Sequence, residues 1–222
     1  MRFSSAACEP RVMRPGEAVR EALLRQWDLV AAAAQIAPPE APTRVRGWTN
    51  REVLAHLALQ PPLLIKFLAA EDEPAIGSPA MSVQTNLSGT GRLAHRIDSA
   101  AVAGAAAGRT DFGAAARRAA PVLRSADLDR QIVSVQGPIR LQDYLVTRCV
   151  EAVVHGFDLS PPSPADDEAL VVAAEALLSI LELAHPELAA TARALPPEVW
   201  VDVATGRAPA PAGLGAAVPV MT

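Results

Sequence analysis

The sequence predicts an all-α fold, and three observations carry this prediction. Alanine runs such as VAAAAQIA and AVAGAAAG recur along the 222 residues, and alanine loses no side-chain entropy in a helix. Aromatic residues make up only 4% of the chain, which favours close-packed helices over sheets. Several long segments also repeat apolar residues at three- and four-residue steps, the period of a helix with one buried face.

The first two helices have clear boundaries. Residues 17–37 carry the helical period, with Pro15 suited to a helix start and Pro38 to its end. The stretch Thr49-Asn50-Arg51-Glu52 has the form of a capping box, so a second helix is expected to begin near Asn50. Pro61-Pro62 predicts a kink or a break before that helix resumes towards residue 70.

The middle of the chain is less regular. Residues 73–91 are rich in Pro, Gly, Ser and Thr, which predicts a loop long enough to act as a lid or a rim. Residues 92–107 and 111–125 predict a broken third helix, in which Gly108 ends the first part and Asp111 caps the second. The alternation in residues 131–135 predicts one short strand or extended arm.

The remaining segments complete the expected architecture. Residues 141–159 and 166–184 predict a fourth and a fifth helix, and the last 36 or so residues offer only one strand-like piece, EVWVDVA. We divide the chain into an N-terminal tail (1–13), a helical bundle (14–160), and an additional helix with a short extended C-terminal tail (161–222). Cys8 and Cys149 lie far apart, one in the tail and one in a helix, so no disulfide is expected.

Composition and charge limit the classes of partner that the protein is expected to bind. The net charge is −4 and the basic residues are scattered arginines, with Lys66 the only lysine, so no basic stripe is available for nucleic acid. No apolar run reaches the roughly 20 residues that cross a bilayer, and even residues 170–184 contain Glu175 and Glu182. The N-terminal MRFSSAACEP lacks the apolar core of an export signal. We expect a cytoplasmic protein that has neither nucleic acid nor a membrane as its partner.

The fourth helix carries an unusual polar stripe. At 100° per residue its polar side chains fall within a band about 80° wide, while apolar residues cover most of the rest, so the helix is expected to be nearly enclosed. The stripe consists of Tyr144, Arg148, Glu151, His155 and Asp158. It is either a thin solvent edge, with Arg148 and Glu151 as an ion pair, or the lining of an internal site.

Glu151 and His155 are four residues apart, so their Cβ atoms are about 5 to 6 Å apart and both side chains can reach one metal ion. A third ligand must come from elsewhere. His185 suits a helix end, and His95 lies in an arginine-rich stretch. His56 points into an apolar surface of the second helix, where it is either a core histidine with one hydrogen bond or a ligand facing the fourth helix, as in bundle metal sites.

Two motifs at these positions resemble the DinB-like metal-binding superfamily, and specifically the N-terminal domain of mycothiol-dependent maleylpyruvate isomerases. They are GWTNREVLAHLA at residues 47–58 and LQDYLVTRCVEAVVHGFDL at residues 141–159. The resemblance spans roughly residues 14–185. It implies a four-helix bundle that holds a divalent metal, usually zinc, through His56, Glu151 and His155. It also implies an active-site arginine between the motifs, for which Arg92 is the nearest candidate.

The resemblance implies a metal-dependent enzyme of the isomerase or thiol-transferase type, with mycothiol as its thiol cofactor and a small molecule as its substrate. Asp158 either fixes the tautomer of His155 or pairs with an arginine. Arg148 either binds a carboxylate of the cofactor or substrate, or holds Glu151 in place.

The sequence leaves several alternatives open. The chain is too short after the fifth helix for the sterol-carrier-like domain of full-length isomerases. A non-catalytic metal-binding module that senses or binds a small ligand is therefore the alternative function. The ligand set also suits nickel, iron and manganese. The alanine-rich surfaces of the third and fifth helices offer a contact for a homodimer.

Overall fold

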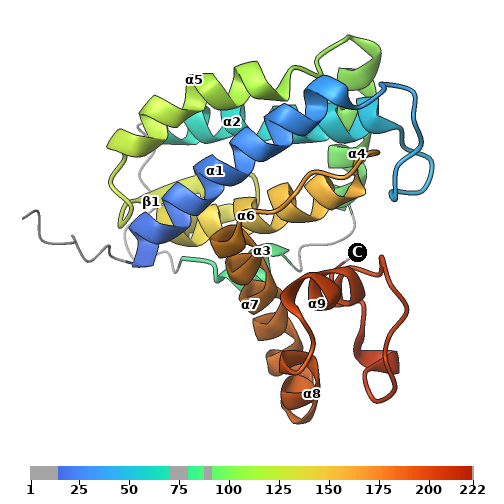
Figure 1. The fold of residues 1–222 in the computed structure, drawn as a ribbon. Coiled ribbons are helices and arrows are strands. Elements are labelled where there is room, and N and C mark those ends of the chain that lie inside the picture. The colour runs from blue at the N-terminus through green and yellow to red at the C-terminus, as the bar shows by residue number, and fades with distance from the viewer. Residues whose placement is uncertain (1–14, 71–79, 88–91, 222) are drawn as a thin grey trace, which may run out of the picture.

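The computed structural model describes residues 15–70, 80–87 and 92–221, without the side chains of residues 92–98. Four helices pack as a bundle (Figure 1), with α1 against α5 and α6, and α2 against α5 and α6. Their bounds are α1 (Pro15–Ile36), α2 (Asn50–Ala69), α5 (Phe112–Ser125) and α6 (Leu141–Asp158). The prediction of an all-α four-helix bundle is confirmed.

Helix α2 begins where the capping box predicts. The backbone N–H of Thr49 donates to Glu52 Oε2 at 2.8 Å, and the helix then continues without a break through Pro61 and Pro62 to Ala69. The expected break does not form. Both turns around the prolines are anchored in the core, through the buried Leu57 on one side and Leu64 on the other, and this packing outweighs the missing backbone donors.

The third helix is interrupted as expected. It consists of α4 (Arg92–Ala106), which packs on α2, and α5. Gly108 lies between them at φ +69°, a conformation that glycine adopts without strain, and Asp111 caps α5 by accepting a hydrogen bond from the Ala114 N–H at 2.8 Å.

An antiparallel hairpin leads into α6. It pairs β1 (Gln131–Ser134) with β2 (Gly137–Arg140), and Gln131 lies opposite Arg140. The strand expected at residues 131–135 is therefore present, together with a partner strand. From the segment 73–91, only α3 (Val83–Leu87) and its flanking residues 80–82 are described, so the expected lid or rim lies largely outside the described residues.

Helix α6 separates two hydrophobic clusters. Leu145, Cys149 and Ala152 face the bundle core between α1, α2 and α5. On another side of the helix, Val150, Val153 and Val154 pack into a second cluster with α7 and α9. Two buried faces leave only a narrow polar strip on α6, which explains why the sequence of this helix is so apolar.

The C-terminal segment differs from the expected extended tail. Helix α7 (Asp167–Ala184) leaves the bundle, and short helices gather against it (Figure 1). They are η1 (Pro186–Leu188), α8 (Ala189–Arg193) and α9 (Pro197–Ala204), and the short η2 (Gly215–Ala217) follows later in the chain. The prediction of a strand at EVWVDVA is wrong, because this piece forms α9. Pro197 stands at a helix start, and the buried Trp200 donates its indole N–H to the Ala174 carbonyl at 3.0 Å, so packing on α7 overrides the strand propensity of the valines.

Helix α2 is long and apolar enough to be compared with a membrane-spanning helix. By length and apolar composition it could cross a bilayer, although the sequence alone indicated no such run. Half of its most apolar window is buried inside the protein, which is typical of a core helix. The division at residues 13 and 160 stays a prediction.

Candidate metal centre

The candidate site lies between α2 and α6, which pack against each other. Helix α2 brings in His56, which is 8% exposed and lies against Trp48, with ring centroids 5.9 Å apart. One turn later on α2, Gln60 is also buried. Helix α6 contributes Glu151 and His155, which lie one turn apart on its polar strip. The narrow strip therefore lines an internal site as well as meeting solvent.

The three candidate ligands converge. His56 Nε2 lies 2.9 Å from Glu151 Oε2, and His155 Nε2 lies 3.5 Å from the same oxygen. The two imidazole rings are 4.6 Å apart between centroids, and one ligand atom from each residue falls within 4.8 Å of the others. In a tetrahedral zinc site with bonds of about 2.0 to 2.2 Å, neighbouring ligand atoms are about 3.4 Å apart. The observed spacing therefore fits one ion.

The protonation states also suit a metal. Burial lowers the pKa of His56, which favours the neutral imidazole that binds metals. Burial alone would raise the pKa of Glu151, but the hydrogen bond from His56 and the neighbouring positive charges hold it well below its usual range. The site therefore presents an ionised carboxylate beside a neutral imidazole at ordinary pH.

The polar network around Glu151 is incomplete within the described residues. Gln60 Nε2 adds a third contact to Glu151 Oε2, at 3.3 Å. However, His56 Nδ1 and Gln60 Oε1 are buried and have no hydrogen-bond partner among the described residues. Since buried polar groups are normally satisfied, these two atoms leave room for a further hydrogen-bond partner, such as water or a ligand, beside Glu151.

Asp158 fulfils both of the roles that the sequence left open. The side chain is fully buried and its Oδ2 lies 2.9 Å from His155 Nδ1. It also pairs with Arg207, which donates from Nε to Oδ1 at 3.1 Å and from Nη2 to Oδ2 at 2.8 Å. Burial opposes ionisation, but the bonds from His155 and Arg207 prevail and lower the pKa of Asp158 to about 2. The acceptor at Nδ1 leaves Nε2 of His155 facing Glu151.

The described contacts test the role of neither arginine proposed from the sequence. Arg148 lies over the ring of Tyr144, with its guanidinium carbon 4.7 Å from the centroid, and donates from Nε to Thr147. The ion pair with Glu151 is not among the described contacts of Arg148. The positive charge of Arg148 nevertheless helps to lower the pKa of Glu151. The side chain of Arg92 lies outside the described residues. Both roles stay predictions.

Other expectations concern residues away from the ligands. Cys149 is a buried free thiol in the bundle core, and burial raises its pKa, so it is not a candidate ligand. Cys8 lies outside the described residues. Arg207 was not found from the sequence, because it follows α9 in a Pro- and Ala-rich stretch and no local pattern connects it with a residue 49 positions earlier.

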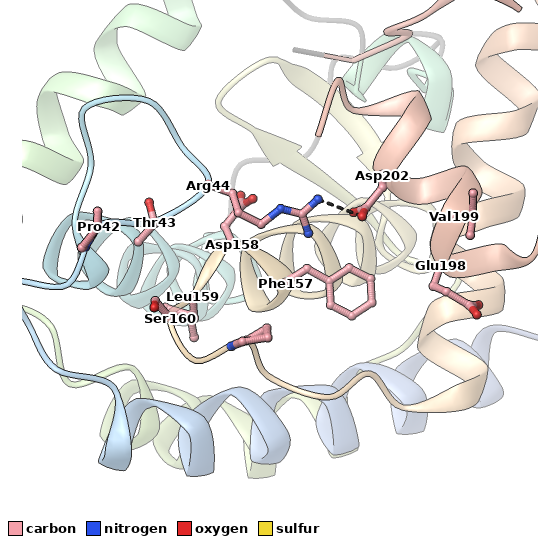
Figure 2. Close-up of a pocket in the computed structure, with 11 residues that line it drawn as sticks. Pro42, Thr43, Arg44, Phe157, Asp158, Leu159, Ser160, Glu198, Val199 and Asp202 are labelled. Atoms are coloured by element: carbon pink, nitrogen blue, oxygen red, sulfur yellow. Dashed lines mark ion pairs between the residues drawn. The ribbon is translucent and has the colours of Figure 1, made fainter. Parts of the chain in front are cut away.

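A pocket of about 620 Å³ lies next to this site. It is formed by the loop around Thr43 and Arg44, the end of α6 and the helix α9, and Figure 2 shows Arg44 reaching Asp202 on α9. That ion pair measures 2.8 Å. The pocket meets the candidate site at Asp158, and its lining does not include the three candidate ligands. Its volume is within the range of small-molecule sites.

The comparisons with known proteins agree with the fold. A crystal structure of the mycothiol-dependent maleylpyruvate isomerase superposes with a TM-score of 0.52 and 16% sequence identity, covering 76% of this chain and 70% of that chain. At this identity the likeness shows the fold alone. A comparison with curated proteins finds no match. The sequence profile of the mycothiol maleylpyruvate isomerase N-terminal domain matches residues 19–160. The chain therefore belongs to the mycothiol maleylpyruvate isomerase N-terminal domain family.

Proposed function

We propose that the protein is a cytoplasmic, divalent-metal-dependent enzyme of the isomerase or thiol-transferase type, which uses a low-molecular-weight thiol such as mycothiol. The observation that carries this proposal is the convergence of His56, Glu151 and His155 within 4.8 Å of one another. Membership of the family supports the thiol and the small-molecule substrate. Zinc is the metal we propose, because two imidazole nitrogens and one carboxylate are typical of its catalytic sites.

Three protein ligands leave a tetrahedral ion with a fourth position for water, thiol or substrate. The ligand side chains are partly accessible, at 10% for His56, 15% for His155 and 20% for Glu151. A closed structural site would instead use four protein ligands. The open side of the three residues therefore favours chemistry over a purely structural role.

The metal supplies Lewis acidity, which at such a position lowers the pKa of a bound thiol or water. The chain's own residues prepare the site for this. His56 and Glu151 hold their donor atoms in place before any ligand arrives, and Asp158 keeps a proton on His155 Nδ1, so that Nε2 is free to bind. Arg148 adds positive charge that acts on Glu151, and we assign it to a carboxylate of the thiol or the substrate. The chemistry that such a site would supply is a thiolate nucleophile, which would add to an activated alkene with uptake of a proton at the neighbouring carbon, or would displace a leaving group.

The first test measures metal content. The protein purified without chelators is analysed by mass spectrometry of metals, beside the variants His56→Ala and His155→Ala and the control His185→Ala. His185 is 44% exposed and pairs with Glu187, so its loss leaves the site unchanged. We expect about one equivalent of metal in the native protein and the control, and loss of metal in both site variants. Equal metal content in all four proteins would contradict the proposal.

The second test separates the enzyme from a non-catalytic module. Turnover of cis-alkene dicarboxylic and related electrophilic substrates is measured with mycothiol, with another thiol and without thiol. The enzyme is supported by thiol-dependent turnover that disappears with the metal. Stoichiometric metal without turnover under any of these conditions favours the metal-binding module instead.

A further inference from the structure

Arg207 lies outside the matched family domain, in the C-terminal segment whose role the sequence left open. We propose that Arg207 is a positioning residue of the metal site, because it fixes Asp158 and through it the orientation of His155. This inference rests on the proposed metal site. It gives the C-terminal segment a direct part in the chemistry of the bundle.

The turn after α9 presents the guanidinium in a defined direction. Gly206 has φ +72°, and the N–H groups of Gly206 and Arg207 bond back to the carbonyls of Val203 and Asp202, which is the bonding pattern of a glycine-terminated helix. Arg207 Nη1 then donates to the Thr205 carbonyl at 2.8 Å. One side of the guanidinium is thus tied to its own helix end, while its other donors face α6.

The contact with Asp158 is bidentate. Nε and Nη2 of Arg207 reach the two carboxylate oxygens at 3.1 and 2.8 Å, the geometry in which a planar guanidinium fixes a carboxylate most firmly. Asp158 is fully buried and Arg207 is only 16% exposed, so water does not compete freely with the pair. Because Arg207 holds both carboxylate oxygens, the position of Oδ2 is fixed. The imidazole of His155 must therefore take one orientation to donate a hydrogen bond from Nδ1 to Oδ2.

The chain of contacts runs from the C-terminal segment to the candidate ligands. Arg207 holds Asp158, Asp158 orients His155, and His155 Nε2 faces Glu151. Partners of this kind keep the ligating nitrogen deprotonated and aimed, and their loss typically costs about 10- to 100-fold in metal affinity. We expect that range for Arg207→Ala.

The chain offers a matched control. Arg44 also binds the C-terminal segment, through Asp202 on α9 at 2.8 Å, but its side chain makes no described contact with the carboxylate of Asp158. If Arg207 acted only by docking α9 against the bundle, Arg44→Ala would weaken the metal site to a similar extent. If it acts through Asp158, Arg44→Ala changes the metal affinity by less than about threefold.

The experiment uses the full chain and the variants Arg207→Ala, Arg207→Lys and Arg44→Ala, each checked for native helix content by circular dichroism. Zinc affinity is measured by competition with a chelator. The absorption spectrum of the cobalt-substituted proteins reports the coordination geometry. Nitrogen-15 NMR of the histidine rings in the metal-free proteins reports the tautomer of His155, a property that a merely structural role of Arg207 would not change.

The inference predicts a single Nδ1–H tautomer for His155 in the native protein and in Arg44→Ala, and a mixture of tautomers in Arg207→Ala, with weaker zinc binding and an altered cobalt spectrum. Arg207→Lys keeps the charge without the bidentate fork, so we expect an intermediate result. Unchanged tautomer and affinity in the folded Arg207 variants would overturn the inference. Failure of the proposed function would be seen separately, as absence of zinc binding in the native protein, while the tautomer still tests the role of Arg207.

Discussion

Replacing His56 with alanine tests the contribution of α2 to the proposed metal site. His56 Nε2 lies 2.9 Å from Glu151 Oε2 and supplies one of the three candidate donor atoms. The other two donors both come from α6, so this substitution separates a site shared between helices from one that α6 makes alone.

The expected magnitude follows from the number of ligands. Structural zinc sites with four protein ligands bind with about 10 to 16 kcal/mol, so one ligand contributes about 2.5 to 4 kcal/mol. Since about 1.4 kcal/mol changes a dissociation constant tenfold, His56→Ala should weaken zinc binding by about 60- to 700-fold. Zinc at 100 times its dissociation constant should stabilise the native protein by about 2.7 kcal/mol. For a chain of this length that corresponds to about 5 to 11 °C in Tm.

The assay combines chelator competition with thermal unfolding followed by circular dichroism, each with and without zinc. The His56→Ala variant should lose both the affinity and the zinc-dependent rise in Tm, while His185→Ala should keep both. Comparing Tm shifts within each variant removes the cost of the cavity left by the buried imidazole. An affinity within threefold of native, or an undiminished zinc-dependent Tm rise, would refute the reasoning.

Three further predictions concern stability and reactivity. Asn50→Ala should destabilise the fold by about 2 to 4 kcal/mol in urea unfolding, because the buried Asn50 donates to the carbonyls of Pro38 and Ser160 and accepts from the Ser160 N–H; a loss below 1 kcal/mol would contradict this. Cys149, studied in a Cys8→Ser background, should react with a thiol reagent at pH 8 at least about 100-fold more slowly than after unfolding, since burial raises its pKa; equal rates would contradict its place in the core. Asp166 caps α7 and pairs with Arg25 at 2.6 Å, so Asp166→Ala should cost about 1 kcal/mol at pH 7. Because the hydrogen bond from Arg25 lowers the pKa of Asp166 in the folded protein, this difference should be complete above pH 5 and shrink as the pH falls below about 4. A difference that grew on acidification would contradict the assignment.

The bundle and the polar strip could be predicted because their signals are local. The spacing of Glu151 and His155 within one helix fixes their relative positions, and the apolar surroundings of that strip already indicated an enclosed helix. The third residue, His56, lies 95 positions before Glu151, and its pairing with α6 required the additional assumption of a bundle.

The C-terminal segment could not be predicted in the same way. Val199, Val201 and Val203 alternate as strand residues do, yet they form α9 because Trp200 packs against α7. Arg207 reaches Asp158 only because this helix docks beside the end of α6. Contacts of this kind depend on tertiary packing, which leaves no periodic signal in the sequence.

The most direct test of the proposed metal site is a crystal structure of the protein grown with zinc, with diffraction data collected on both sides of the zinc absorption edge. The site predicts one strong anomalous peak about 2.0 to 2.2 Å from His56 Nε2, a carboxylate oxygen of Glu151 and His155 Nε2, with Asp158 still bonded to His155 Nδ1. A peak elsewhere, or none between α2 and α6, would contradict it.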